Sequence, residues 1–126
     1  MSNSTEVMVL DDEIIVCDRL KDYLEKKGIS VEIFSESQKA LDRLKEKTFD
    51  VIITDVKMQG PTGIDVLMEV KNNAYNTEVI VITGFSTLET FRQAEYIGAF
   101  DFINKPFQMS EIYNLVKKAA KKVRNR

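Results

Sequence analysis

The stretch Val51-Ile52-Ile53-Thr54-Asp55 decides the fold class, because it is short, apolar on both faces and ends in a carboxylate. A run of this kind is typical of a central strand in a parallel sheet that helices cover on both sides. Val79–Ile82 has the same character and ends at Thr83. The other predicted strands are Val7–Leu10, Val31–Phe34 and Phe102–Ile103.

Helical patterns with apolar residues three or four positions apart follow each of these strands. The predicted helices cover about 13–27, 37–47, 63–72, 86–98 and 109–123. The fourth opens with Ser86-Thr87-Leu88-Glu89, which is typical of a capping box. Five strand–helix units predict an α/β fold, a flavodoxin-like doubly wound (βα)5 sandwich. Its five-stranded parallel sheet should have the order 2-1-3-4-5.

Length and composition limit the possible classes of function. The chain has 126 residues and a net charge of −2, which suits one domain with no general attraction for nucleic acid. We expect a single domain over 1–126, with an ordered core at about 6–123 and no output domain. The chain has one cysteine, Cys17, and no histidine, so an internal disulfide, a zinc site and a Ser-His-Asp triad are excluded. No apolar run is long enough for a membrane span, and the expected location is the cytoplasm.

Polar residues stand where four of the predicted strands end. They are Asp11 and Asp12, Asp55, Thr83, and Lys105. Parallel strands bring their carboxyl ends to one edge of the sheet, so these groups should share one pocket. Three carboxylates, a hydroxyl and an ammonium suit a divalent cation and a phosphoryl group.

The carboxylates suit Mg²⁺ (or Mn²⁺), which prefers oxygen ligands and keeps some water. We expect Asp12 and Asp55 to bind it directly, Asp11 to act through water, and the backbone carbonyl of Lys57 to complete the protein ligands. Asp55 could also act as a nucleophile toward phosphorus. Taken singly, the aspartates could instead cap a helix or a turn, Thr83 could be an ordinary strand residue, and Lys105 could be a solvated lysine.

The chain resembles the receiver domain of two-component response regulators over nearly its whole length. The matching segments are Val9–Glu13, Asp55–Met58 with Gly63 eight positions after Asp55, Thr83-Gly84, and Gly98–Phe107. The last segment is most similar to receivers that precede sigma-54 activator modules. The chain departs from the family at Gln59, where proline is frequent, and at Thr62, where aspartate is common.

The resemblance implies a role for each matching residue. Asp55 would be the phosphoacceptor, Asp11 and Asp12 would belong to the Mg²⁺ site, and Thr83 and Lys105 would hold the phosphoryl group. Phe102 would be the aromatic switch residue that follows the movement of Thr83. The donor would be the phosphohistidine of a sensor histidine kinase or of a histidine phosphotransfer protein.

Three finer expectations concern the residues around the pocket. The Lys105–Pro106 bond is predicted to be cis, which would aim the Lys105 ammonium into the pocket. Lys57 and Phe85 should obstruct the water that hydrolyses the phosphoryl group, so self-dephosphorylation should be slow. The exposed surface that switches should comprise the fourth helix, fifth strand and fifth helix, and Phe85, Phe91 and Tyr96 could form a partner surface or pack in the core.

The expected downstream partner is an output protein or a C-terminal output domain, and a phosphorylation-dependent dimer is possible. The basic residues at the end of the chain suit a solvated helix face better than a DNA-binding surface. Two other functions stay open: a pseudo-receiver that is never phosphorylated, and a flavodoxin-like cofactor binder. Against the second, Asp11-Asp12-Glu13 would repel a phosphate that arrives without a metal.

Overall fold

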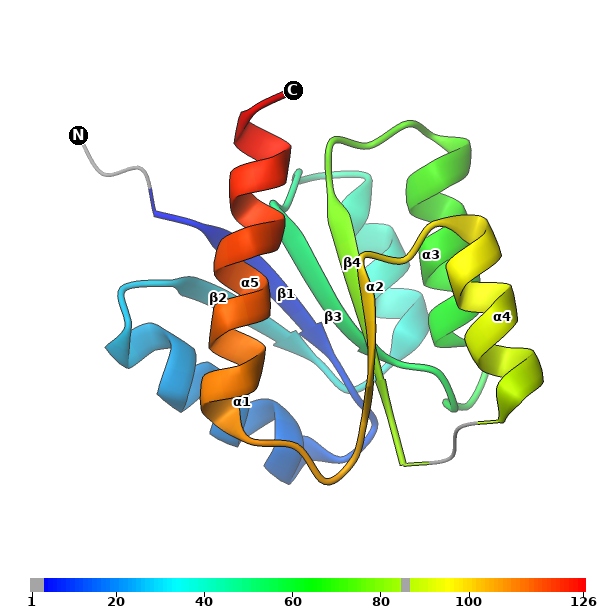
Figure 1. Cartoon of the computed structure of the whole chain (residues 1–126), viewed down its shortest axis with the longest axis horizontal. Coiled ribbons are helices and arrows are strands. Elements are labelled where there is room, and N and C mark those ends of the chain that lie inside the picture. Colours follow the sequence, from blue (N-terminus) through cyan, green and yellow to red (C-terminus); the bar gives the residue numbers. More distant parts are fainter. Residues whose placement is uncertain (1–3, 85–86) are drawn as a thin grey trace.

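The computed structural model describes residues 4–84 and 87–126, and it has five parallel strands and five helices. The strands are β1 (Glu6–Leu10), β2 (Ser30–Phe34), β3 (Val51–Asp55), β4 (Glu78–Thr83) and β5 (Asp101–Asn104). The helices are α1 (Ile14–Lys26), α2 (Ser37–Leu44), α3 (Gly63–Asn72), α4 (Leu88–Ile97) and α5 (Met109–Arg124). The strand order β2-β1-β3-β4-β5 confirms the prediction (Figure 1). No helix in the described ranges is both long and apolar enough to span a membrane.

Helices cover both faces of the sheet, and each face has its own core. One core joins α1 and α5 to strand residues such as Val9, Ile53 and Ile82. The other joins α2, α3 and α4 to Leu10, Ile52 and Val81. Neighbouring residues along a strand therefore pack against opposite layers, as the two-residue period of a strand requires.

Two helix boundaries differ from the predicted ones by more than one residue. The second helix ends at Leu44 rather than at 47, with Lys45 as its C-cap residue. The Lys47 side chain, beyond the helix, pairs with Glu6 and Glu32 at 3.1 and 3.0 Å. The predicted capping box of the fourth helix was wrong. Thr87 is the N-cap, and its hydroxyl accepts a hydrogen bond from the backbone N–H of Thr90. Ser86 lies outside the described residues.

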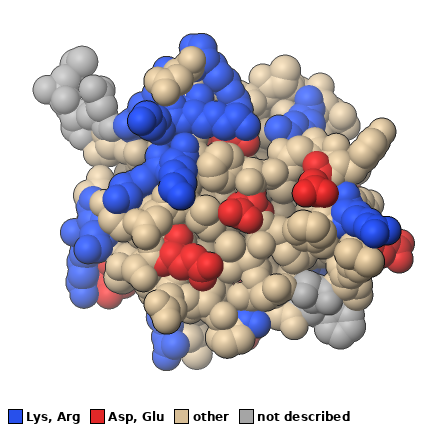
Figure 2. Space-filling view, in the orientation of Figure 1, with Lys and Arg blue, Asp and Glu red and all other residues tan. Residues whose placement is uncertain are grey.

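The basic end of α5 is tied to the amino-terminal edge of the sheet. The Glu78 carboxylate at the start of β4 is fully buried, and it pairs with Arg126 and, at 3.4 Å, with Lys122. Asn76 Nδ2 donates to the backbone oxygen of Val123 at 3.3 Å. Figure 2 shows Lys and Arg gathered over this half of α5. Two of these cations therefore neutralise a buried carboxylate, while others in the cluster face solvent.

Candidate functional site

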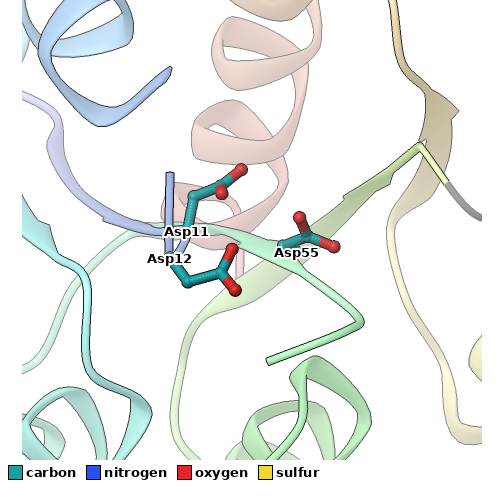
Figure 3. Close-up of side chains that lie close together, drawn as sticks. All are labelled: Asp11, Asp12 and Asp55. Atoms are coloured by element: carbon teal, nitrogen blue, oxygen red, sulfur yellow. The ribbon is translucent and has the colours of Figure 1, made fainter. Parts of the chain in front are cut away.

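Three aspartates lie together at the carboxyl edge of the sheet. Asp11 and Asp12 follow β1, and Asp55 ends β3, which pairs directly with β1. One carboxylate oxygen from each of the three lies within 4.8 Å of the other two. Figure 3 shows the side chains leaving two neighbouring strand ends. The predicted grouping of Asp11, Asp12 and Asp55 is thus present in the structure.

The three carboxylates differ in their exposure to water. Asp11 is fully buried, Asp55 is 6% exposed, and Asp12 is open to solvent. Burial raises the pKa of Asp11, and hydrogen bonds from Lys105 and from the backbone of Glu13 oppose that rise. The Cys17 thiol of α1 donates to the backbone oxygen of Asp11 at 3.3 Å, and this contact ties α1 to the residue that follows β1. Only Asp12 therefore offers its carboxylate freely to an incoming ligand.

Lys105, which directly follows β5, brings a cation into this acidic group. Its Nζ lies 2.8 Å from Asp11 Oδ2 and 2.9 Å from Asp55 Oδ2. A third carboxylate, that of Glu13, lies 3.0 Å from the same nitrogen. Burial alone would lower the pKa of Lys105, but the hydrogen bonds to the three carboxylates raise it overall. The ammonium therefore stays charged in the pocket. The Lys105–Pro106 bond is cis, as predicted.

Thr83 lies beside Lys105 at the end of β4. It is 1% exposed, and its backbone oxygen accepts a hydrogen bond from the Lys105 N–H at 2.8 Å. The β4–β5 register pairs Thr83 with Asn104, one residue before the lysine. The hydroxyl and the ammonium that the sequence singled out thus come from neighbouring strand ends.

The loop after Asp55 is held close to the Asp55 side chain. Lys57 donates its backbone N–H to Asp55 Oδ1 at 3.1 Å, and Gly63 donates to the Val56 backbone oxygen at 3.0 Å. A Cβ on Gly63 would lie 2.1 Å from the Asp55 backbone oxygen, so no side chain fits there. The Lys57 carbonyl has the sequence position expected of a metal ligand, and that assignment stays a prediction.

Gln59 and Thr62, the two positions of this loop that differ from the receiver pattern, each make a specific hydrogen bond. Gln59 accepts a hydrogen bond at its backbone oxygen from Ser37 Oγ, 3.1 Å away at the start of α2. Thr62 is the N-cap of α3, and it forms a capping box with Asp65. The spacing Thr62-x-x-Asp65 could have revealed that box from the sequence, whereas nothing in the sequence indicated the Ser37 contact.

Phe102 packs on the layer formed by α2, α3 and α4. Its ring meets Phe91 of α4 edge to face, with the centroids 5.5 Å apart and the planes at 85°. Phe91 is 39% exposed and Tyr96 is 92% exposed, so Tyr96 is a surface residue and Phe91 is shared between core and surface. Phe85, predicted to influence dephosphorylation, lies outside the described residues.

The donor set fits a hard divalent cation. All three acidic side chains present oxygen, and Mg²⁺ selects carboxylate and carbonyl oxygens while it retains water. The exposed face of Asp12 adjoins a hollow of about 480 Å³ that Gln59, Gly60 and Pro61 line on one side. Water can reach the Asp12 carboxylate from that side.

Comparison with known proteins identifies the class. The family model for the response regulator receiver domain matches residues 7–117, so the chain belongs to the response regulator receiver family. The chain is 30% identical over 117 residues to the transcriptional regulatory protein ZraR of Escherichia coli K12, covering 93% of this chain and 26% of ZraR. It is 29% identical to FixJ of Bradyrhizobium diazoefficiens, covering 94% of this chain and 58% of FixJ. It thus spans only part of these relatives.

Solved structures agree with this assignment. A receiver domain from Clostridium thermocellum is 30% identical and superposes with a TM-score of 0.89, covering 95% of this chain and 97% of that one. The beryllofluoride-activated NtrC4 receiver domain dimer is 31% identical, with a TM-score of 0.87 and coverage of 94% and 98%. A CheY-like receiver from Methanospirillum hungatei, at 22% identity and a TM-score of 0.93 with 98% of both chains covered, shares the fold.

Proposed function

We propose that this chain accepts a phosphoryl group on Asp55 from the phosphohistidine of a sensor histidine kinase or a histidine phosphotransfer protein, and thereby controls an output partner. The observation that carries the proposal is the Asp55 carboxylate, held 2.9 Å from Lys105 Nζ and grouped with Asp11 and Asp12. A carboxylate beside both a cation-binding cluster and a fixed ammonium is suited to attack phosphorus.

The reaction forms one bond and breaks another. An oxygen of Asp55 attacks the phosphorus, and the P–N bond of the donor imidazole breaks, with its electron pair returning to the ring nitrogen. Mg²⁺ held by Asp11, Asp12, Asp55 and the Lys57 carbonyl would neutralise phosphoryl oxygens during transfer. Lys105 leaves a carboxylate and binds one phosphoryl oxygen, and the Thr83 hydroxyl donates to another.

The switch would start at Thr83. When the Thr83 hydroxyl moves toward the phosphoryl group, it leaves space that the Phe102 ring can occupy. Because Phe102 contacts Phe91, this rotation would change the packing of α4 against the sheet. The surface of α4, β5 and α5 would then change its affinity for an output domain, an output protein or a second copy. We place this activity in the cytoplasm, with no direct role for the chain in binding DNA or a membrane.

The experiment is phosphorylation of the purified protein with acetyl phosphate and Mg²⁺, followed by intact-mass measurement. The proposal expects one added phosphoryl group in the wild type and none in Asp55→Asn, with the same circular dichroism spectrum for both. Asp42→Asn, an exposed aspartate of α2, is the matched control and should be phosphorylated normally. No added mass in the wild type would favour a pseudo-receiver, and a bound chromophore would favour a flavin binder.

A further inference from the structure

The Glu13 side chain contacts the pocket rather than its own helix. It is the N-cap residue of α1, with extended backbone angles, yet its carboxylate makes no cap hydrogen bond. The carboxylate instead contacts Lys105 Nζ at 3.0 Å, across 92 residues of sequence. The Glu13 backbone N–H donates to Asp11 Oδ1 at 2.9 Å, and this hydrogen bond holds the Glu13 backbone beside the pocket.

Lys105 has no N–H to spare in this arrangement. An ammonium has three N–H donors, and the carboxylates of Asp11, Asp55 and Glu13 lie within 3.0 Å of the nitrogen. A phosphoryl oxygen can therefore gain a hydrogen bond from Lys105 only when one carboxylate gives up its own.

Charge and exposure separate the three partners of Lys105. The side chains of Asp11 and Asp55 are 0% and 8% exposed, while that of Glu13 is 65% exposed. Asp55 loses its negative charge when it is phosphorylated, and Asp11 keeps its contact because a buried carboxylate without its cation is strongly disfavoured. Glu13 stays an anion that water can solvate at little cost, so it is the partner that still competes with the phosphoryl group for Lys105.

We propose that Glu13 is a positioning residue of the phosphorylation site: it holds Lys105 in the resting state and sets the charge that Mg²⁺ and the phosphoryl group meet. The inference rests on the proposed function of Asp55. The Glu13 carboxylate adds negative charge beside the metal cluster and competes for the ammonium that the phosphoryl group requires. It therefore favours binding of Mg²⁺ and opposes binding of the anion.

The test is Glu13→Gln, which keeps the length of the side chain and removes its charge. Mg²⁺ affinity, measured by NMR titration of backbone amides, should fall by about threefold, as expected for loss of one nearby charge in a solvated site. Affinity for beryllofluoride at saturating Mg²⁺ should rise by a similar factor, and phosphorylation by acetyl phosphate should become faster. Glu13→Asp, which keeps the charge, should retain most of the wild-type Mg²⁺ affinity.

Glu25→Gln is the matched control. Glu25 is an exposed glutamate near the other end of α1, and it pairs with Lys21 rather than with Lys105. This variant should leave both affinities within measurement error of the wild type. A purely structural role of Glu13 would move the two affinities in the same direction.

The outcomes separate this inference from the proposed function. Opposite changes in Mg²⁺ and beryllofluoride affinity support the role of Glu13. Changes in the same direction, or none, overturn it, even when the wild type is phosphorylated on Asp55. If the wild type accepts neither a phosphoryl group nor beryllofluoride, the proposed function fails, and the role of Glu13 fails with it, whatever the Mg²⁺ titration shows.

Discussion

The ring of Phe102 on β5 meets the ring of Phe91 on α4 at an angle of 85° and a centroid distance of 5.5 Å. Edge-to-face pairs of this geometry contribute roughly 0.5–1.5 kcal/mol beyond the burial of their surface. The contact joins β5, the strand that directly precedes Lys105, to a helix whose side chains are largely exposed. It is a packing contact between this strand and α4.

Beryllofluoride should therefore change backbone NMR shifts along α4 as well as around Asp55. In Phe102→Ala, which removes the ring, the changes should be confined to the pocket, because α4 loses its contact with the moving residue. Tyr96→Ala is the control, since that side chain is 92% exposed and the wild-type pattern should persist. An identical response of α4 in Phe102→Ala would contradict this route.

Replacing Lys105 by Met should destabilise the protein in the absence of metal. Asp11 and Asp55 would keep their buried carboxylates but lose the cation, which we expect to cost about 1–3 kcal/mol. Mg²⁺ should then raise the melting temperature of Lys105→Met by more than that of the wild type, because it relieves a larger repulsion. Lys118→Met on α5 should behave like the wild type, and Asp12→Ala should lose the response to Mg²⁺.

Replacing Gly63 by Ala should disturb Asp55 itself. The new Cβ would meet backbone atoms of Asp55 and Val56, so the end of β3 must shift, at a cost of roughly 1–3 kcal/mol. Phosphorylation by acetyl phosphate should slow markedly. Gly84→Ala is the matched control, since its Cβ would make only ordinary contacts of 3.7 Å with the Lys105 side chain. Equal phosphorylation rates in the two variants would count against this reasoning.

Stability at acid pH should depend on Glu32. Hydrogen bonds from Arg43, reinforced by Lys47 and opposed by burial, lower the pKa of Glu32 to about 2. A carboxylate whose pKa is lower in the folded state stabilises the fold above its unfolded pKa of 4.5, and that stability is lost as the pH falls toward 2. Urea unfolding of Glu32→Gln should therefore show a weaker pH dependence between 4.5 and 2. Asp22→Asn, from an exposed pair on α1, should keep the wild-type pH profile.

The phosphorylated protein should lose its phosphoryl group slowly. Lys57 and Phe85 offer no carboxylate or amide to align a water opposite Asp55, and the Lys57 cation can hold a phosphoryl oxygen. The double variant Lys57→Asn/Phe85→Glu should hydrolyse at least about tenfold faster, a barrier change of ~1.4 kcal/mol. Decay is followed by intact mass after removal of the donor. A wild-type half-life of seconds, or an unchanged rate in the double variant, would refute the argument.

The sequence predicts the sheet and the main site residues because both follow from strand ends. Two of the strands, Val51–Asp55 and Val79–Thr83, are buried and parallel. Their carboxyl ends therefore lie at the same edge of the sheet, and Asp55 and Thr83 lie there for any conformation of the loops. The register that places Lys105 beside Thr83 follows from the same geometry.

The residues that sequence reasoning missed depend on loop conformation. Glu13 reaches Lys105 because the chain turns directly after β1, and Ser37 reaches Gln59 because two loops approach each other over the sheet edge. Neither contact follows from a fixed spacing of residues in the sequence. The N-cap of the fourth helix was misplaced by one residue for a related reason: Ser86 and Thr87 are both good N-cap residues, and only the backbone decides between them.

Adjacent residues of β5 belong to different layers: Phe102 packs with α4, and Ile103 packs with α1 and α5. We expect a rotation that passes from Thr83 through Phe102 to leave the packing of α1 against the sheet unchanged, even though the Glu13 side chain at its start releases Lys105. A protein docked on α1 would consequently stay bound through many rounds of phosphorylation, while one docked on α4 would bind and leave with each round. The kinase and the output partner could then occupy the molecule at the same time.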